Sequence, residues 1–249
     1  MTYEKGDKKM PRFFLPVSEN DKTITVTGDN ARHIGRSLRM KIGEQLTVTC
    51  QGTDYICAVS EFTEDTVILE ILSAERCQSE PTVNITLYQA LPKSDKLEFI
   101  IQKAVELGAS KIVPVMTRRC ISRPSEKDFA RKLARLQKIA LEASKQSGRG
   151  IIPEISSVIS FNDAVKQMKN DDCALMLYEN GGVRFSETGI ENAKKISIFV
   201  GSEGGFDDEE AEYAKSEGII PVWLGKRILR CETAPITALS IAMFLTKNL

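Results

Sequence analysis

Two stretches near the end of the chain each join an apolar run, a glycine-marked loop and a helix pattern, and they constrain the fold most strongly. Residues 198–206 read Ile-Phe-Val-Gly-Ser-Glu-Gly-Gly-Phe, and residues 222–234 read Val-Trp-Leu-Gly-Lys-Arg-Ile-Leu-Arg-Cys-Glu-Thr-Ala. Both patterns are typical of a strand that leads through a loop into a helix. In open α/β sheets, ligands bind beyond the carboxyl ends of the strands. The two loops are therefore predicted to form two sides of one pocket.

The first of these loops favours a capped helix and a close approach of a ligand to the backbone. Gly204 and Gly205 free the main chain from side-chain clashes, and Asp207 with Glu210 makes a capping-box pattern. No lysine follows the glycines, so the pattern of a phosphate-binding loop is absent. The acidic run at 207–210 would repel an anion. A ligand with positive charge suits this surface better, although an ordinary strand-to-helix turn is the alternative.

The second loop brings cations into an otherwise apolar stretch. Lys226, Arg227 and Arg230 lie between Gly225 and a helix predicted over residues 232–245. A solvated basic turn accounts for Lys226. Arg230 lies between an apolar residue and the start of the helix, so it is a candidate functional residue.

Composition excludes several classes of protein. The 249 residues carry no formal net charge and hold six cysteines and one histidine. No cysteines are spaced as Cys-x-x-Cys, so a structural zinc site or a histidine-based triad is disfavoured. Scattered single cysteines favour a reducing cytoplasm. No apolar run is long enough to span a membrane, and residues 1–9 are charged, so they are expected to be a disordered extension.

The first part of the chain, residues 10–75, is predicted to be a small β-barrel, because short strand patterns alternate with turn residues. One helix is expected over residues 30–38. Strands are expected at residues 13–15, 22–27, 45–50, 55–59 and 66–71. Residues 76–82 are polar, contain a proline and are expected to be a linker.

After the linker, strands alternate with helices, which predicts a mostly parallel sheet covered on both faces. The expected helices cover residues 94–107, 125–144, 161–168, 207–217 and 232–245, and the expected strands lie at 83–88, 111–115, 173–178, near 196 and near 222.

Basic residues gather in two places, the helix at 30–38 and residues 118–149. Clustered Lys and Arg neutralise phosphates, so both groups are candidate RNA-facing surfaces. A solvated helix face is the alternative for each, and a hydrogen-bonded structural role is the alternative for His33. The candidate RNA-binding residues are Arg12, Arg32, His33, Arg36, Arg39, Lys41, Arg118, Arg119 and Arg149.

The paired loops resemble the signature loops of the RsmE family, which are bacterial 16S ribosomal RNA methyltransferases of the SPOUT superfamily. The resemblance continues at Leu91-Pro92-Lys93, residues 103–108, residues 142–149 and the start of the chain from Met10. It implies an N-terminal PUA-like RNA-binding barrel and, over residues 83–249, a SPOUT domain with a C-terminal trefoil knot. It also implies a homodimer that acts on 16S rRNA or the 30S subunit, with no membrane or DNA partner.

The resemblance further implies transfer of a methyl group from S-adenosylmethionine to N3 of a uridine, without a metal. Arg230 is the candidate for stabilising the uracil, and Glu203 and Glu232 are candidate bases. The expected donor-binding residues are Leu177, Glu179, Val200, Gly201, Glu203, Gly204, Leu224, Gly225, Ile228, Leu229, Thr233 and Ala234. Cys231, Pro235 and Ser202 depart from the residues usual in the family. The alternatives are a SPOUT enzyme for another RNA nucleoside and a non-catalytic ribosome-assembly factor.

Overall fold

The chain forms two compact units. The computed structural model describes residues 10–18 and 20–249, so the predicted extension at residues 1–9 lies outside the described residues. Among the described residues, unit 1 comprises 10–18, 20–80 and Gly148–Ile151, and unit 2 comprises Pro81–Ser147 and Ile152–Leu249. The sequence pattern places residues 148–151 in the second domain. The chain instead returns to unit 1 for these four residues before it continues in unit 2.

Unit 1 is built on a five-stranded mixed sheet with the hydrogen-bonded order β1-β3-β4-β5-β2. Its strands are β1 (Arg12–Phe14), β2 (Thr23–Thr27), β3 (Gln45–Cys50), β4 (Thr53–Phe62) and β5 (Thr66–Arg76). β1 pairs parallel with β3, whereas the other neighbours are antiparallel. β1 and β2 end this order and are not recorded as paired with each other, so the sheet is not closed into a complete barrel. Alternating residues such as Val26, Leu46 and Leu69 are buried in its core.

The predicted helix at residues 30–38 is present but has two geometries. Residues Gly28–Arg32 form α1, and His33–Ser37 continue it as the π-helical turn η1. Ile34 is fully buried, while Arg32, His33 and Arg36 are exposed. The apolar residues of this segment therefore anchor it on the sheet and its basic residues face solvent.

Unit 2 contains a parallel sheet with the order β12-β10-β11-β6-β7-β8, and β9 also pairs with β7. Its strands are β6 (Asn84–Ala90), β7 (Lys111–Met116), β8 (Glu154–Ile155), β9 (Ile159–Ser160), β10 (Cys173–Leu177), β11 (Lys195–Val200) and β12 (Ile220–Val222). Every strand pair recorded in this sheet is parallel. The carboxyl ends of the strands consequently lie along one edge, as the alternating sequence pattern predicts.

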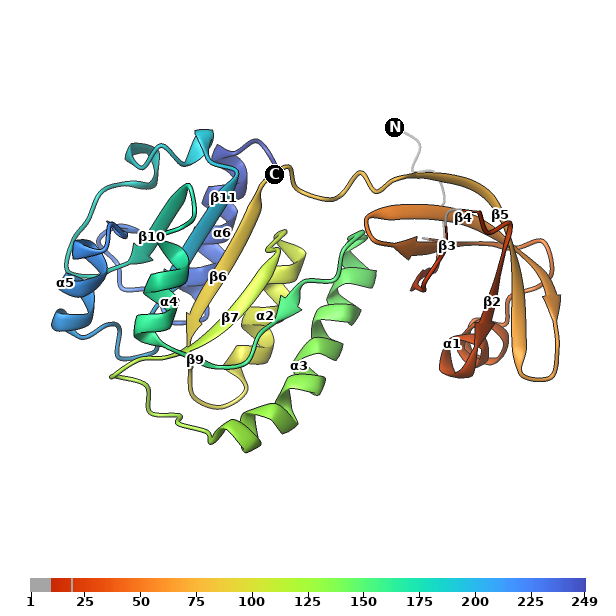
Figure 1. Cartoon of the computed structure of the whole chain (residues 1–249), viewed down its shortest axis with the longest axis horizontal. Coiled ribbons are helices and arrows are strands. Elements are labelled where there is room, and N and C mark those ends of the chain that lie inside the picture. Colours follow the sequence, from red (N-terminus) through yellow and green to blue (C-terminus); the bar gives the residue numbers. More distant parts are fainter. Residues whose placement is uncertain (1–9, 19) are drawn as a thin grey trace. The chain divides into compact units, whose positions relative to one another are not determined.

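Helices cover both faces of this sheet (Figure 1). The α-helices of unit 2 are α2 (Lys96–Glu106), α3 (Glu126–Ser147), α4 (Phe161–Met168), α5 (Asp208–Ser216) and α6 (Thr233–Leu245). α2 packs against α3 and α6, and α4 meets α5 on the other face through Phe161 and Tyr213, whose ring centroids are 6.4 Å apart. Two 3₁₀ turns that the sequence did not predict, Phe185–Glu187 and Ile190–Asn192, lie between β10 and β11.

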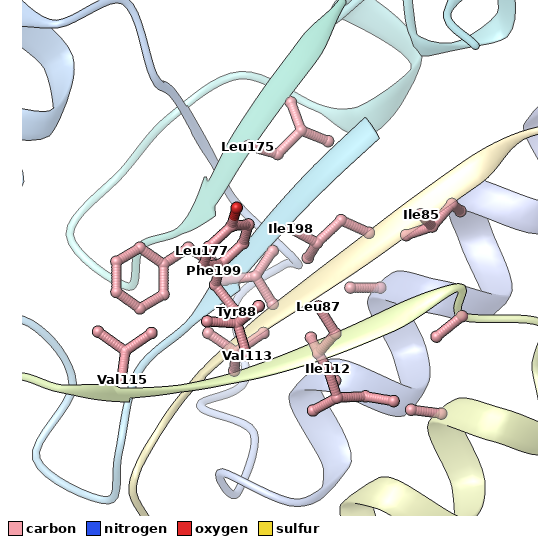
Figure 2. Close-up of a cluster of buried hydrophobic side chains, with 14 of the residues drawn as sticks. Ile85, Leu87, Tyr88, Ile112, Val113, Val115, Leu175, Leu177, Ile198 and Phe199 are labelled. Atoms are coloured by element: carbon pink, nitrogen blue, oxygen red, sulfur yellow. The ribbon is translucent and has the colours of Figure 1, made fainter. Parts of the chain in front are cut away.

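The central strands of unit 2 are apolar on both faces, as a doubly covered parallel sheet requires. Figure 2 shows side chains of β6, β7, β10 and β11 packed together, among them Ile85, Ile112, Leu175 and Ile198, which are fully buried. This core fixes the strands whose carboxyl ends carry the loops described next. No helix among the described residues is long and apolar enough to cross a membrane.

Candidate functional site

A pocket of about 440 Å³ opens at the carboxyl ends of β10, β11 and β12. A volume of this size is typical of small-molecule sites. The two loops predicted from the sequence form its sides, residues 201–206 after β11 and residues 223–230 after β12. We call them the first loop and the second loop. The end of β10, the first residue of α2, Cys231 just before α6 and Ala234 in the first turn of α6 complete the lining.

Most of the predicted donor-binding residues line this pocket. Thr233 alone among them does not, and it lies exposed at the start of α6. The predicted residues in the lining are Leu177, Glu179, Val200, Gly201, Glu203, Gly204, Leu224, Gly225, Ile228, Leu229 and Ala234. Arg230 lines it as well, and Glu232 lies outside the lining but contacts a residue within it. The structure thus brings together residues that are more than fifty positions apart in the chain.

The first loop is a tight turn that only glycine can make at its key position. The Gly205 amide donates to the Ser202 carbonyl at 3.0 Å. Gly205 has φ +66°, and a Cβ at this residue would lie 2.2 Å from Oε1 of Glu179. The backbone conformation and the crowding by Glu179 both exclude a side chain there. The loop therefore presents bare main chain to the pocket.

The helix after the first loop is capped as the sequence predicts. The Asp207 side chain accepts from the Glu209 amide, and the Glu210 side chain accepts from the Asp207 amide, both at 3.2 Å. Phe206 is fully buried, and its ring centroid lies 4.8 Å from that of Phe199. These contacts fix the end of the loop that leads into α5 to the core of unit 2.

The second loop is more open. Lys226, Arg227 and Arg230 are exposed, and Ile228 is 88% exposed. The Arg230 carbonyl accepts from the Thr233 and Ala234 amides at 2.9 Å, which starts α6. No ion pair of the Arg230 side chain is recorded among the described residues. Its guanidinium is available to a ligand at the mouth of the pocket.

Lys96, the first residue of α2, joins the two loops. Its Nζ lies 3.1 Å from Oε1 of Glu203 in the first loop and 3.1 Å from Oε2 of Glu232, which follows the second loop. Cys231 Sγ lies 3.6 Å from the same ammonium. Glu203 also accepts from the Lys93 amide at 3.1 Å. One cation thus bridges the two carboxylates that the sequence offered as bases.

The charged groups of this cluster stabilise one another's ionised forms. Hydrogen bonds to Glu203 and then to Glu232 raise the pKa of Lys96. Burial opposes ionisation of both carboxyls, but hydrogen bonds to them, including those from Lys96, hold the pKa of Glu203 and of Glu232 below the usual range. Burial and the neighbouring Glu232 raise the pKa of Cys231 to about 12. At neutral pH the cluster therefore holds one ammonium, two carboxylates and a protonated thiol.

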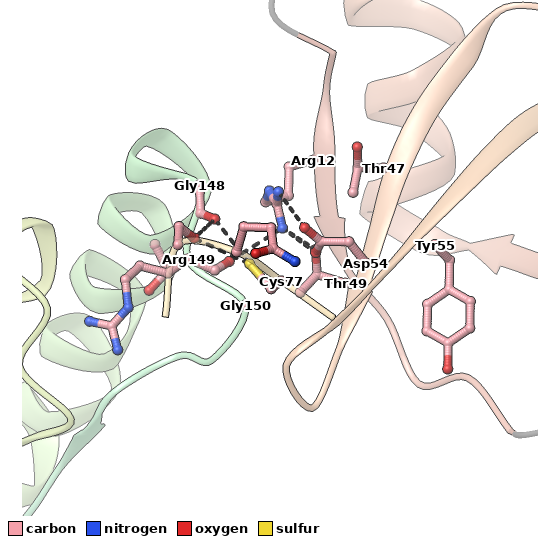
Figure 3. A network of polar contacts seen from close by, with 12 residues as sticks. Arg12, Thr47, Thr49, Asp54, Tyr55, Cys77, Gly148, Arg149 and Gly150 are labelled. Atoms are coloured by element: carbon pink, nitrogen blue, oxygen red, sulfur yellow. Dashed lines mark hydrogen bonds and ion pairs between the residues drawn. The ribbon is translucent and has the colours of Figure 1, made fainter. Parts of the chain in front are cut away.

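The candidate RNA-binding residues divide into buried and exposed groups. Arg149 pairs with Glu80 at 2.9 Å and its side chain is only 4% exposed. Arg12 pairs with Asp54 and donates to Thr49 at 2.6 Å (Figure 3). Both guanidinium groups are engaged inside unit 1, so the structure argues against the RNA contacts predicted for them. Arg12 also donates to the Arg149 carbonyl at 3.4 Å, so the two side chains hold residues 148–151 within unit 1.

The remaining basic candidates are accessible. In unit 1, Arg32 pairs with Asp29 but stays 64% exposed, and the exposed His33 ring packs edge-on against Phe13 at 5.8 Å. Arg36, Arg39 and Lys41 are also exposed.

In unit 2, two further candidates contact the neighbourhood of the first loop. Arg118 pairs with Asp207 at 3.0 Å and also with Glu209. Arg119 donates to the Gly204 carbonyl at 3.1 Å. Both side chains remain exposed.

Lys96, Tyr178 and Trp223 also line the pocket but are not among the residues predicted from the sequence. A signal for Lys96 was present, because it follows the carboxyl end of β6, and the rule that located the two loops applies to that strand equally. Among residues 10–18 and 20–249, no group of three or more His, Cys, Asp or Glu is placed to hold a metal ion.

Comparison with known proteins agrees with this architecture. Residues 78–243 match an RNA methyltransferase domain, and residues 26–72 match an RNA methyltransferase PUA domain. The chain is 31% identical to ribosomal RNA small subunit methyltransferase E of Bacillus subtilis, over 96% of this chain and 98% of that protein.

Solved structures give the same result. The enzyme of that name from Neisseria gonorrhoeae, solved with S-adenosylmethionine bound, is 33% identical, with a TM-score of 0.86 over 95% of this chain and 98% of that one. A methyltransferase from Legionella pneumophila, also solved with S-adenosylmethionine, is 29% identical, with a TM-score of 0.85 and the same coverage of both chains. The predicted fold, a PUA-like unit followed by a parallel α/β unit, is confirmed, and the chain belongs to the RsmE family of RNA methyltransferases.

Proposed function

We propose that this protein transfers a methyl group from S-adenosylmethionine to N3 of a uridine in 16S ribosomal RNA. The observation that carries the proposal is the pocket between the two glycine-marked loops at the carboxyl ends of β10, β11 and β12. The small-subunit rRNA methyltransferases to which the chain is similar, one of them with S-adenosylmethionine bound, support the same reading.

The residues present suit this donor. Leu177, Val200, Leu224 and Ala234 supply apolar walls for an adenine ring and a thioether. The first loop exposes main-chain groups, where added Cβ atoms would clash, and these can pair with the adenine edge. Glu179 supplies negative charge near a cationic ligand. When bound, S-adenosylmethionine supplies an activated methyl group on a positively charged sulfur.

The chain's own residues must then orient the uracil, help N3 lose its proton and stabilise the charge that spreads onto the uracil oxygens. We assign the stabilising role to Arg230, because its exposed guanidinium lies at the pocket and a cation placed where negative charge develops lowers the barrier. Glu203 and Glu232 are the carboxylates in reach of the pocket. Their shared bond to Lys96 and lowered pKa make both weak bases.

RNA binding is proposed for the exposed basic residues only. In unit 1 these are Arg32, His33, Arg36, Arg39 and Lys41, on or just after the α1–η1 helix. In unit 2 they are Arg118 and Arg119. Clustered exposed cations supply the phosphate contacts on which RNA affinity depends. Arg12 and Arg149 are not included, because their side chains are engaged within unit 1.

A homodimer is proposed for the assembly. Helix α6 contains no charged residue between Thr233 and Leu245, and Phe244 on it is 68% exposed. An exposed apolar helix surface favours association with a second copy. The C-terminal trefoil knot and a cytoplasmic location on the small ribosomal subunit belong to the same proposal.

Calorimetric titration with S-adenosylmethionine and then S-adenosylhomocysteine tests the donor site. Saturable binding in the micromolar range supports the proposal, and mapping of the methylated nucleoside separates N3 of uridine from another RNA nucleoside. Absence of binding at millimolar donor, with folded protein and with small-subunit RNA present, would favour a non-catalytic assembly factor.

A further inference from the structure

Lys96 lines the pocket but has no role in the proposed chemistry. It is the first residue of α2, and its ammonium reaches Glu203 and Glu232, both at 3.1 Å. Cys231 lies 3.6 Å away. An ammonium has three N–H donors, and these three neighbours account for all of them. Lys96 therefore has no donor left for a bound molecule, although it lines the pocket.

The turn that carries Lys96 is held in an unusual backbone conformation. Ser94 has φ +56°, in the left-handed region that residues other than glycine rarely adopt. In this turn the Lys93 amide donates to Oε1 and Oε2 of Glu203, at 3.1 and 3.4 Å. Strained backbone persists where surrounding contacts over-determine it. Two groups of the β6–α2 turn thus converge on the first loop.

Besides Lys96, the Cys231 thiol also contacts both carboxylates, since it donates to Glu232 at 3.2 Å and interacts with Glu203. Glu203 belongs to the first loop, and Glu232 immediately precedes α6 after the second loop. The side chains of Lys96, Glu203 and Glu232 are 30%, 28% and 23% exposed. A single exposed ion pair contributes little. A partly buried cation shared by two loops acts differently, because it sets the distance between them.

We propose that Lys96 is a positioning residue that holds the first and second loops at the spacing required by the methyl donor. This inference rests on the proposed function, because the donor defines the spacing that matters. Glu203 and Glu232 then serve as the attachment points of the two loops. Arg230, two residues before Glu232, is placed by the same contact.

The test compares Lys96→Met with Lys96→Arg and with the matched control Lys103→Met. Lys103 lies on the same helix and pairs with Glu106 at 2.9 Å, with similarly exposed side chains, but it does not line the pocket. Lys96→Met should weaken S-adenosylmethionine binding about tenfold or more, equivalent to about 1.4 kcal/mol. Lys96→Arg should restore most of the affinity, since a guanidinium can bridge two carboxylates. Lys103→Met should bind as the wild type does.

A pH profile separates this role from general destabilisation. The charged and titratable groups that face the cluster are Lys96, Glu203, Glu232 and Cys231. Without Lys96 the two carboxylates repel each other and the pKa of one rises. Donor affinity of Lys96→Met should then fall as the pH rises and the second carboxyl ionises, while wild-type affinity stays flat over the same pH range.

Donor binding by the wild type and by Lys96→Met distinguishes failure of the positioning role from failure of the proposed function. If the wild type binds the donor and Lys96→Met binds equally well with a flat pH profile, the positioning role is wrong and the proposed function stands. If the wild type itself does not bind, the proposed function fails first. Should Lys96→Met not fold, Glu232→Gln removes one attachment only. A several-fold loss of donor affinity in that variant supports the inference, and unchanged affinity overturns it.

Discussion

The two loops around the pocket differ in whether their polar side chains are bonded within the protein or exposed to solvent. In the first loop, Glu203 accepts from Lys96 and from the Lys93 amide, and Gly205 closes a tight turn. In the second loop, Lys226 and Arg230 are exposed. A loop whose polar groups are engaged within the protein can hold one ligand in a fixed geometry. A loop with unengaged cations can meet a second, larger and negatively charged substrate.

The arginines of unit 1 show the same contrast. Arg149 is buried against Glu80, and the Glu80 carboxylate also accepts from the Gly150 and Ile151 amides at 2.7 and 3.0 Å. Arg36 and Arg39 are exposed. Arg149 therefore has a structural role, whereas Arg36 and Arg39 remain accessible to a ligand. Stability measurements on variants can detect this difference.

The largest effect is expected from Arg149→Met. It leaves the Glu80 carboxylate buried without its partner, which costs about 3–5 kcal/mol. Chemical unfolding should show this loss, and Arg36→Met should change stability by less than about 0.5 kcal/mol. Burial opposes ionisation of Glu80, but bonds from Arg149 hold its pKa below the ordinary 4.5. The difference between variants should therefore be full above that pH and shrink as the pH falls further. Equal stability of the two variants would remove the contrast between these arginines.

The next largest effect is expected from Arg230→Ala. Loss of a group that stabilises developing charge lowers turnover by about 10²- to 10³-fold, whereas donor affinity should stay within a few fold. Lys226→Ala, in the same loop, should leave both quantities near their wild-type values. Initial rates of methyl transfer and calorimetry measure the two quantities separately. Normal turnover by Arg230→Ala would exclude this residue from the mechanism.

Gly205→Ala alters the first loop. In contrast to Arg230→Ala, it should weaken donor binding, by about tenfold. The added Cβ would lie 2.2 Å from Glu179 Oε1, on a residue with φ +66°. Gly218→Ala is the matched control, because Gly218 also has positive φ (+87°) but a Cβ there meets nothing within 4 Å. Both variants should lose stability through backbone strain, and only Gly205→Ala should lose donor affinity. Equal donor affinities would show that the first loop tolerates displacement of Glu179.

The smallest effect per substituted residue is expected for RNA binding by the exposed basic residues of unit 1. Reversal of Arg32, Arg36 and Arg39 to Glu should weaken RNA binding and make its salt dependence shallower. Reversal of Arg131, Lys132 and Lys138 on α3 changes the charge equally and should have less effect. RNA titrations at several salt concentrations measure both slopes. Identical slopes for the two triple variants would show that the basic residues of the α1–η1 surface are solvated and do not bind RNA.

Much of this architecture could be predicted from the sequence, because local patterns carry it. The strand-to-helix alternation, the capping box of α5 and the two glycine loops all appear in short windows of residues. The parallel sheet then brings the loops together, since strand ends share one edge. Glu203 and Glu232 were located in this way, although their pairing through Lys96 was not.

What the sequence did not reveal depends on contacts between distant residues. The engagement of Arg12 and Arg149 arises from Asp54 and Glu80, which lie 42 and 69 positions away. Nothing in a basic cluster shows which of its members will be buried. The return of residues 148–151 to unit 1 and the short strands β8 and β9 likewise depend on tertiary packing, which outweighs local propensity.

The most direct test of the account is methyl transfer from isotope-labelled S-adenosylmethionine to small subunits that lack the modification, followed by nucleoside analysis of the rRNA. Labelled N3-methyluridine is expected at a single position with the wild type and almost none with Arg230→Ala, although that variant binds the donor. Label in another nucleoside, or no label despite saturated donor, would contradict this expectation.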